Sequence, residues 1–250
     1  YQPFEKGGYF IGAPSIKRIV RAVLGMPREK NDESYEKIEK NLNEQIVHCI
    51  YDGQKLPLPI VNSAVNRASN PFAFEKDKGN PGEDRFWEWH KALSTACALV
   101  KKFYYDYRKE DYKVELETSR CERDYLYGRL LAVADRIESH AMYKKGRDTS
   151  NLGVTNALRY MSAFAQHPFR TWNFLFSQLL NPYIQQLDGA EWYLSLIGSI
   201  KAMFKPGDFE SDAALDGRYL LGYFAQRQYF YEQKTKDAQG GLSNELDKQD

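Results

Sequence analysis

Residues 217–234 read GRYLLGYFAQRQYFYEQK, an aromatic-rich segment that is expected to be helical although it contains Gly222. The segment YLYGRLLA (125–132) repeats the same Tyr-Leu-x-Gly pattern around Gly128. A glycine inside a helix costs about 0.5–1 kcal/mol relative to alanine, so a compensating interaction is expected. The two glycines therefore predict positions at which a neighbouring helix approaches closely, and they assign 217–226 to the core.

The second half of the opening segment combines a basic residue with aromatic residues. On a helix, Arg227 shares a face with Tyr223 and with Phe230 or Tyr231. A guanidinium stacked on aromatic rings can be purely structural. The same combination also holds the bases and phosphates of single-stranded nucleic acids. Both interpretations remain open from the sequence alone.

Helical periodicity extends along most of the chain and predicts, among others, helices at 13–25, 123–143, 151–166 and 167–187. In 85–109, for example, apolar residues recur every three or four positions: Phe86, Trp89, Leu93, Cys97, Val100 and Tyr104. No segment shows the alternation of a strand ladder, so we predict an all-α multi-helix bundle that could consist of two packed helical subdomains. The expected organisation is a helical region at 1–110, a linker at 111–122, a helical bundle at 123–236 and a disordered tail at 237–250.

Composition excludes several classes of protein. Hydrophobic residues make up 42% and charged residues 28% of the 250 residues, as in ordinary globular proteins. No apolar run approaches the roughly 18 residues of a membrane span, so no membrane association is expected. The three cysteines, Cys49, Cys97 and Cys121, form no CxxC pair. A disulfide framework and a zinc cluster are therefore not expected, and a reducing cytoplasm fits best.

Catalytic motifs are not evident. The sequence contains no P-loop, HExxH motif, serine elbow or glycine-rich nucleotide turn. The four histidines, His48, His90, His140 and His167, do not share a spacing suited to joint ligation of a metal. We therefore expect a protein that is not an enzyme, with no catalytic residue, no metal and no cofactor.

Charge is distributed unevenly although the net charge is only +1. Basic residues outnumber acidic ones between 144 and 187, whereas the run 208–216 is acidic. A run of charge is usually only a solvated face, so this excess does not establish nucleic-acid binding by itself. The candidate DNA-binding residues are Lys144, Lys145, Arg147, Arg159, Arg170, Lys201 and Arg227.

Three segments carry a resemblance: RDYLYGRLLAVADRIE (123–138), TNALRYMSAFAQHPFRTWNFLFSQLLNPYIQQL (155–187) and GRYLLGYFAQRQYFYEQK (217–234). In this order they resemble the C-terminal region of the large subunit of type I-C CRISPR interference (Cascade) complexes. Upstream segments, among them LNEQIVHCIYDGQKLPLPIVNSAVNRAS (42–69), are similar to the middle region of the same family. The resemblance covers about 12–236.

The resemblance implies an antiviral ribonucleoprotein that finds DNA through a guide RNA. The large subunit of this family reads a short DNA motif through an N-terminal domain, which is not expected among these residues. Its helical C-terminal domain packs beside backbone and small subunits and helps hold the displaced non-target strand of the R-loop. The implied partners are these subunits, target DNA, guide RNA indirectly and a recruited helicase-nuclease that cuts the DNA.

Two interpretations follow for the helical domain. In the first, its basic residues hold single-stranded DNA by phosphate neutralisation and some stacking, while guide pairing provides sequence specificity. In the alternative, the chain is a purely structural protein–protein scaffold of the same complex and its basic residues are solvated. Cross-linking of the assembled complex to DNA or to protein distinguishes them.

Overall fold

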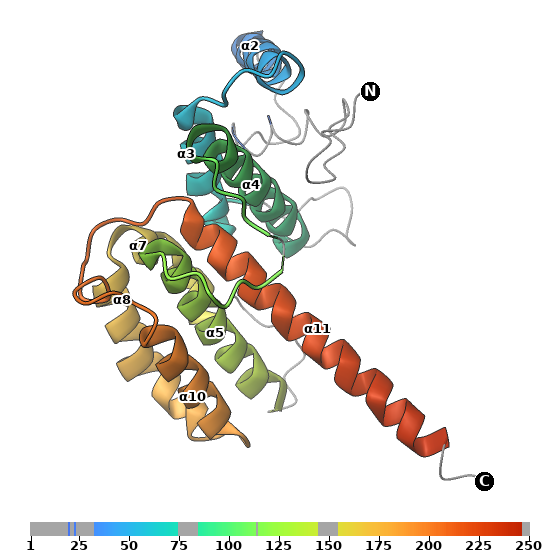
Figure 1. Ribbon diagram of the computed structural model, residues 1–250, viewed down its shortest axis with the longest axis vertical. Helices are drawn as coiled ribbons and strands as arrows, with labels where there is room; N and C mark the ends of the chain where they lie inside the picture. Colours follow the sequence, from blue (N-terminus) through green and yellow to red (C-terminus); the bar gives the residue numbers. More distant parts are fainter. Residues whose placement is uncertain are drawn as a thin grey trace. The chain divides into compact units, whose positions relative to one another are not determined.

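The computed structural model describes residues 20, 23, 33–74, 85–113, 115–144 and 155–246 (Figure 1). Two compact units make up the chain, Tyr1–Tyr112 and Lys113–Asp250, and each is described by itself. All regular secondary structure among the described residues is helical, and none of these residues lies in a β-strand. The predicted all-α bundle is therefore confirmed.

The first unit contains helices α2 (Glu33–Tyr51), α3 (Leu58–Ala68) and α4 (Arg85–Arg108), with a short 3-10 turn, η1 (Pro71–Ala73). Helix α3 packs against α4. The predicted apolar stripe of α4 is buried from Trp89 to Tyr104, and the Trp89 indole Nε1 donates a hydrogen bond of 2.7 Å to the Ala68 carbonyl. Phe86 is helical, but its side chain lies outside the description.

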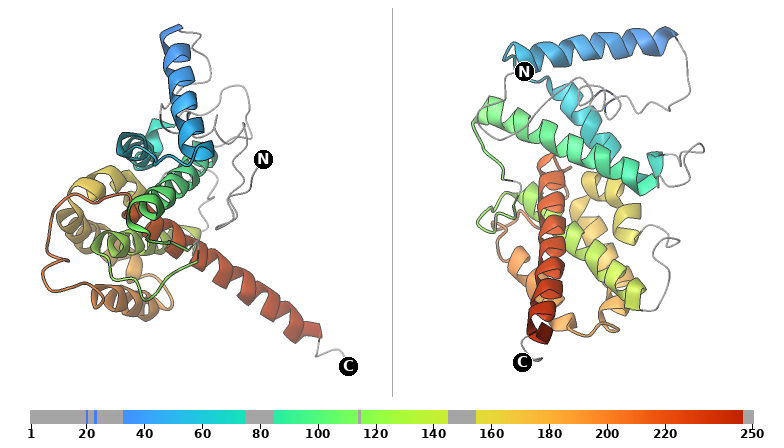
Figure 2. Two further views of the ribbon diagram at one scale, coloured as in Figure 1. Left: turned by 45° about the horizontal axis from the view of Figure 1, so that its top comes forward. Right: turned by 90° about the vertical axis from the view of Figure 1, so that its right-hand side faces the viewer.

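The second unit is built around helix α5 (Arg123–Lys144). The other elements are α6 (Asn156–Arg159), α7 (Met161–Gln166), α8 (Pro168–Phe174), the π-helical turn η2 (Leu175–Leu180), α9 (Asn181–Ile184), α10 (Ala190–Lys201) and α11 (Arg218–Leu246). Helix α5 contacts α11, α10, α9, α6 and η2. Figures 1 and 2 show α11 lying along α5, with α10 beside α5 as well.

Helix α5 is buried on nearly all sides. Its buried apolar residues are Tyr125, Leu126, Tyr127, Leu130, Leu131, Ala132, Val133, Ala134, Ile137 and Ala141. An amphipathic surface helix shows one apolar stripe, whereas a helix that is apolar all round is a core helix. Helix α5 is therefore the centre of the second unit, and it also carries four buried charged residues: Asp124, Arg129, Asp135 and Glu138.

The two glycines predicted to allow close packing do so, and each faces the other helix. A Cβ on Gly128 would lie 2.7 Å from the backbone nitrogen of Tyr223 and would overlap the carbonyl of Tyr219. A Cβ on Gly222 would overlap the carbonyl of Tyr125. The prediction from the Tyr-Leu-x-Gly pattern is therefore confirmed, and 217–226 lies in the core at the contact of α5 and α11.

Residues 156–184 of the second unit form shorter helices than the sequence predicts. The expected helix at 151–166 divides at Tyr160 into α6 and α7, and its first residues lie outside the description. The expected helix at 167–187 widens into η2 before Pro182, which stands in the first turn of α9. Proline lacks an N–H and clashes with the carbonyl four residues earlier, so a wider turn ahead of it relieves that clash.

Helix α11 extends further than the sequence indicates. We expected a disordered tail from 237, but the helix continues to Leu246. The segment EQKTKDAQ (232–239) consists mainly of residues with good helix propensity, which favours elongation once the core anchors the first turns. The expected helix at 13–25 lies outside the described residues, except for Val20 and Val23, which are both helical.

Candidate nucleic-acid interface

Four of the seven candidate DNA-binding residues have described side chains. Arg159 ends α6, Arg170 lies on α8, Lys201 ends α10 and Arg227 lies on α11. Lys145 and Arg147 lie outside the described residues, and Lys144 ends α5 without a described side chain. Of the four, Arg159, Arg170 and Lys201 are exposed, whereas Arg227 is half-buried.

Arg170 and Lys201 both contact the acidic segment 202–217, which joins α10 to α11. The Arg170 Nε lies 3.1 Å from Asp212 Oδ2, although 80% of the Arg170 side chain is exposed. The Arg170 backbone N–H donates to Asp212 Oδ1 at 3.2 Å. The Lys201 Nζ lies 4.4 Å from the centre of the Phe209 ring. A phosphate that binds Arg170 must therefore compete with the Asp212 carboxylate.

Arg227 belongs to a hydrogen-bonded chain that runs into the core. Its Nη atoms donate to the hydroxyls of Tyr223 and Tyr231, both at 3.3 Å, and its guanidinium lies 6.0 and 5.8 Å from the two ring centres. The Tyr223 hydroxyl donates to Asp135 Oδ2 at 2.9 Å, and Thr155 donates to Asp135 Oδ1 at 2.7 Å. Burial, and then the charge of Asp135, raises the pKa of Tyr223.

These hydrogen bonds favour a structural role for the contact between Arg227 and Tyr223. Tyr223 is fully buried, so it offers no surface to a base, whereas Tyr231 is 51% exposed. A ligand can therefore reach the Arg227 guanidinium only from the side of Tyr231. Thr155 also caps α6 by accepting a hydrogen bond from the Leu158 N–H, so the same chain connects α5, α6 and α11.

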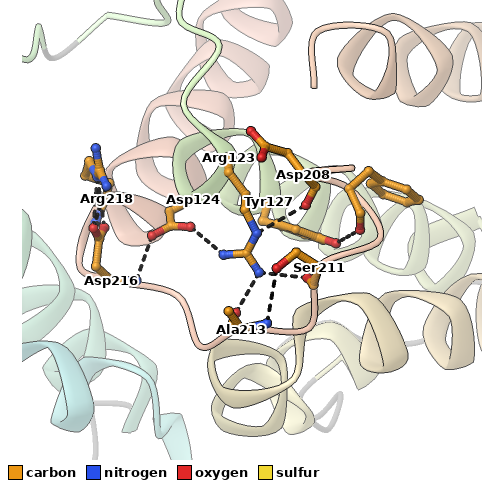
Figure 3. Close-up of polar contacts among 9 residues, drawn as sticks. Arg123, Asp124, Tyr127, Asp208, Ser211, Ala213, Asp216 and Arg218 are labelled. Carbon is orange, nitrogen blue, oxygen red and sulfur yellow. Dashed lines mark hydrogen bonds and ion pairs between the residues drawn. The ribbon is translucent and has the colours of Figure 1, made fainter. Parts of the chain in front are cut away.

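A second polar cluster fixes the acidic segment to α5 (Figure 3). Arg123 donates to three backbone carbonyls, those of Asp208 at 3.2 Å, Ser211 at 2.8 Å and Ala213 at 2.6 Å. Tyr127 donates its hydroxyl hydrogen to the Phe209 carbonyl. These bonds hold the segment that carries Asp212 and Phe209, and they therefore position the partners of Arg170 and Lys201.

Asp124 completes this cluster next to Arg123. Its two oxygens accept hydrogen bonds from Arg123 at 2.8 Å and from the Asp216 backbone N–H at 2.9 Å, while Asp216 itself pairs with Arg218 at 2.7 Å (Figure 3). Burial, and then the negative charge of Asp216, raises the pKa of Asp124 to about 6, against the smaller effect of Arg123. The carboxyl therefore titrates near neutral pH.

Sequence reasoning missed Arg123, Asp124 and Tyr127. Apart from the pair that Arg123 and Asp124 form with each other, their partners lie more than 80 residues away and are mostly backbone carbonyls, which have no sequence signature. The available signal was the acidic run 208–216 itself, which needed cationic or N–H partners. Within the described part of the chain, no three His, Cys, Asp or Glu side chains are grouped so as to hold a metal ion. No helix there is long and apolar enough to cross a membrane.

Comparison with known proteins identifies a family. The family model described as CRISPR-associated protein (Cas_Csd1) matches residues 3–231. This span includes both units up to Tyr231 and all seven candidate residues. No curated protein matches the chain.

Proposed function

Because the chain belongs to the Cas_Csd1 family of CRISPR-associated proteins, we propose that it is a non-catalytic subunit of a type I-C RNA-guided DNA surveillance complex. The proposed role of its second unit is to help hold target DNA, above all the displaced non-target strand, and to pack against neighbouring subunits. Base pairing to the guide RNA would supply sequence specificity, so this unit needs to bind the backbone of the strand. Cutting is assigned to a recruited helicase-nuclease.

The observation that supports this proposal is the exposure of the cations on the second unit. Arg159, Arg170 and Lys201 lie on three different helices and are exposed, although Arg170 pairs with Asp212 and Lys201 lies over the Phe209 ring. The acidic groups of α5 do not oppose them at the surface, since Asp135 and Glu138 are buried and accept hydrogen bonds from within the unit. A polyanion would therefore meet exposed cations at Arg159 and Lys201, whereas at Arg170 it would compete with Asp212.

The test is the salt dependence of binding to single-stranded DNA. In the assembled complex, Arg159, Arg170 and Lys201 are replaced together by glutamine, and affinity for target DNA is measured between 50 and 300 mM salt. Each lost phosphate contact should flatten the slope of log K against log[salt] by about 0.7. The matched control replaces Lys37, Lys40 and Lys55, three exposed lysines of the first unit. An unchanged slope in the first variant would refute the proposal.

A scaffold without DNA contact is the second candidate. It is favoured by exposed apolar side chains on the second unit, such as Leu194 at 44% and Phe174 at 41%, which suit a protein partner. Cross-linking separates the two functions. Adducts between residues 155–205 and DNA support strand binding, whereas adducts to protein alone support the scaffold.

A further inference from the structure

We propose that Trp192 is a stacking platform for an unpaired nucleobase and that Arg136 binds the adjoining phosphate or base. This inference rests on the proposed function and extends it to a surface that the basic run of the sequence does not include. The ligand class is single-stranded nucleic acid, because only an unstacked base can present its face to a protein ring.

Trp192 has the properties of such a platform. It is 50% exposed, in contrast to Trp89 and Trp172, which are 0% and 2% exposed. Two edge-to-face contacts fix its orientation: the Tyr193 ring at 4.9 Å and 74°, and the Phe230 ring at 6.1 Å and 64°. An aromatic side chain held in this way loses little further entropy when a ligand binds, so stacking on it is favourable.

Arg136 and His140 contact the two rings that hold Trp192. The Arg136 guanidinium is 6.0 Å from the centre of Phe230, the same ring that Trp192 contacts, and it also hydrogen-bonds the Tyr193 side chain. His140 Nδ1 lies 3.1 Å from the Tyr193 hydroxyl oxygen. Trp192 and Arg136 therefore share two aromatic neighbours, Tyr193 and Phe230.

The acids of α5 do not oppose a polyanion at this surface, although Glu191, next to Trp192 on α10, is exposed. On α5, the acids Asp135 and Glu138 are 8% and 0% exposed, and both accept hydrogen bonds inside the unit, from Thr155 and Tyr223 and from Asn156 and the Ala157 N–H respectively. The outward stripe of α5 carries Arg136, His140 and Tyr143, spaced so that they share one face.

This stripe also leads to the candidate residues at the end of the helix. Tyr143 is 70% exposed, and Lys144, the next residue, ends α5. A strand stacked on Trp192 could therefore continue along α5 past Tyr143 towards Lys144.

A protein partner would use the surface differently. Leu194 lies two residues after Trp192 on α10, so the two side chains project from different faces of the helix, and Leu194 is 44% exposed. An apolar protein contact at α10 is expected to respond to Leu194→Ala, whereas base stacking responds to Trp192 alone. Leu194→Ala is thus a matched control for truncation of an exposed apolar side chain on this helix.

The experiment uses the full chain and a fluorescently labelled oligothymidylate at low salt. Trp192→Ala should weaken binding about 5- to 150-fold, the range expected for the loss of one stacked base. Arg136→Gln should weaken binding and flatten the salt slope, and Leu194→Ala should leave affinity unchanged. Circular dichroism checks that the variants fold, and Trp192→Phe, which keeps a ring, should bind with intermediate affinity.

Two further readouts separate stacking from other effects. Binding of oligothymidylate should quench tryptophan fluorescence in the wild type, and the quenching should be lost in Trp192→Phe. An oligonucleotide with abasic sites keeps its phosphates, so wild type and Trp192→Ala should bind it equally. If Trp192→Ala still weakens binding to the abasic strand, the stacking role is wrong.

The remaining outcomes distinguish this inference from the proposed function. In one outcome, the Trp192 variants keep wild-type affinity and quenching while replacement of Arg159, Arg170 and Lys201 still flattens the salt slope. This result would overturn the stacking role of Trp192 and leave the proposed strand binding in place. An assembled complex whose affinity for target DNA and salt slope respond neither to the Trp192 and Arg136 variants nor to replacement of Arg159, Arg170 and Lys201 would overturn both. Weakening of oligothymidylate binding by Leu194→Ala as large as by Trp192→Ala would overturn the platform as well, because the loss would not be specific to the Trp192 ring.

Discussion

Gly222 lies directly against the backbone carbonyl of Tyr125, so that a Cβ on this glycine would overlap the oxygen and lie only 3.2 Å from the Tyr125 Cα. Gly128 has the reciprocal relationship with the carbonyl of Tyr219 on the other helix. Because the neighbouring atoms are backbone, they cannot move aside as the end of a flexible side chain can. The two glycines therefore set the distance between α5 and α11, the central contact of the second unit.

We predict that Gly222→Ala and Gly128→Ala each lower the free energy of unfolding of the second unit by about 1–3 kcal/mol or more, since an added methyl group must push the two helices apart. Denaturation in urea, followed by circular dichroism, measures the change. The control is Gly198→Ala in α10, where a Cβ would meet nothing within 4 Å. That substitution should raise the free energy of unfolding by about 0.5–1 kcal/mol. Equal effects at Gly198 and Gly222 would contradict the close-packing account.

These glycines also show what a sequence can predict about this fold. A glycine within a helical pattern indicates a close approach, because the local cost must be offset by packing. It does not name the partner, and nothing local to Gly128 indicates that its partner helix begins at Arg218. Similarly, helical periodicity predicted the extent of α4 and α5, but the turn η2 depends on how Pro182 is accommodated after the chain has packed.

We predict that Asp124 makes the stability of the second unit depend on pH. Its pKa is raised from 3.8 to about 6 by burial and then by Asp216, against the effect of Arg123. A group whose pKa is higher in the folded state stabilises the fold below its unfolded pKa and loses this contribution as pH rises through the folded value. Asp124→Asn should therefore gain stability relative to the wild type between pH 4 and 7, by at most about 3 kcal/mol.

Urea denaturation of both proteins at several pH values measures this difference. The charged groups that face the Asp124 carboxyl are Arg123 and Asp216, and Arg218 pairs with Asp216. Their effects are common to both proteins, so the comparison isolates Asp124. A difference in the free energy of unfolding that stays constant from pH 4 to 7 would mean that Asp124 titrates at its ordinary pKa.

We predict that Arg123→Lys loosens residues 208–216 of the acidic segment. A lysine has a single ammonium group and cannot reproduce the fork with which Arg123 reaches the carbonyls of Asp208, Ser211 and Ala213. Loss of these charge-assisted bonds should lower the free energy of unfolding by about 1.5–3 kcal/mol. Hydrogen exchange of the amides at 208–216 should become faster in the variant.

The matched control for this experiment is Arg120→Lys. Arg120 precedes α5 and pairs with the side chains of Glu117 and Glu122. Replacing it should change stability by about 1 kcal/mol or less, as for most ion pairs near the surface. If exchange at 208–216 responds to Arg120→Lys as strongly as to Arg123→Lys, then Arg123 does not fix this segment specifically.

The candidate interface could be predicted only in part, and Arg227 shows why. Its spacing from Tyr223 and Tyr231 correctly predicts that the guanidinium lies near both rings. The sequence could not indicate that the Tyr223 hydroxyl bonds Asp135 on another helix, which turns half of this cluster into core structure. Trp192 and Arg136 were missed for the same reason, because their shared neighbour Phe230 comes from a distant segment. Whether any of these residues binds DNA stays a prediction.

We predict that Asp212→Asn strengthens binding of single-stranded DNA. Asp212 pairs with Arg170 at 3.1 Å and competes with phosphate for that guanidinium. Asparagine keeps an oxygen that can accept the hydrogen bond from the Arg170 N–H, but it removes the competing charge. The gain should be about fivefold, corresponding to ~1 kcal/mol for two charges near 4 Å in water. Fluorescence anisotropy at constant salt measures it, with Asp208→Asn as a control that removes a charge from the same segment. Because the effect acts through Arg170, the gain in affinity should vanish when Asp212→Asn is combined with Arg170→Gln. A gain that persists in the double variant would show that the phosphate does not bind at Arg170.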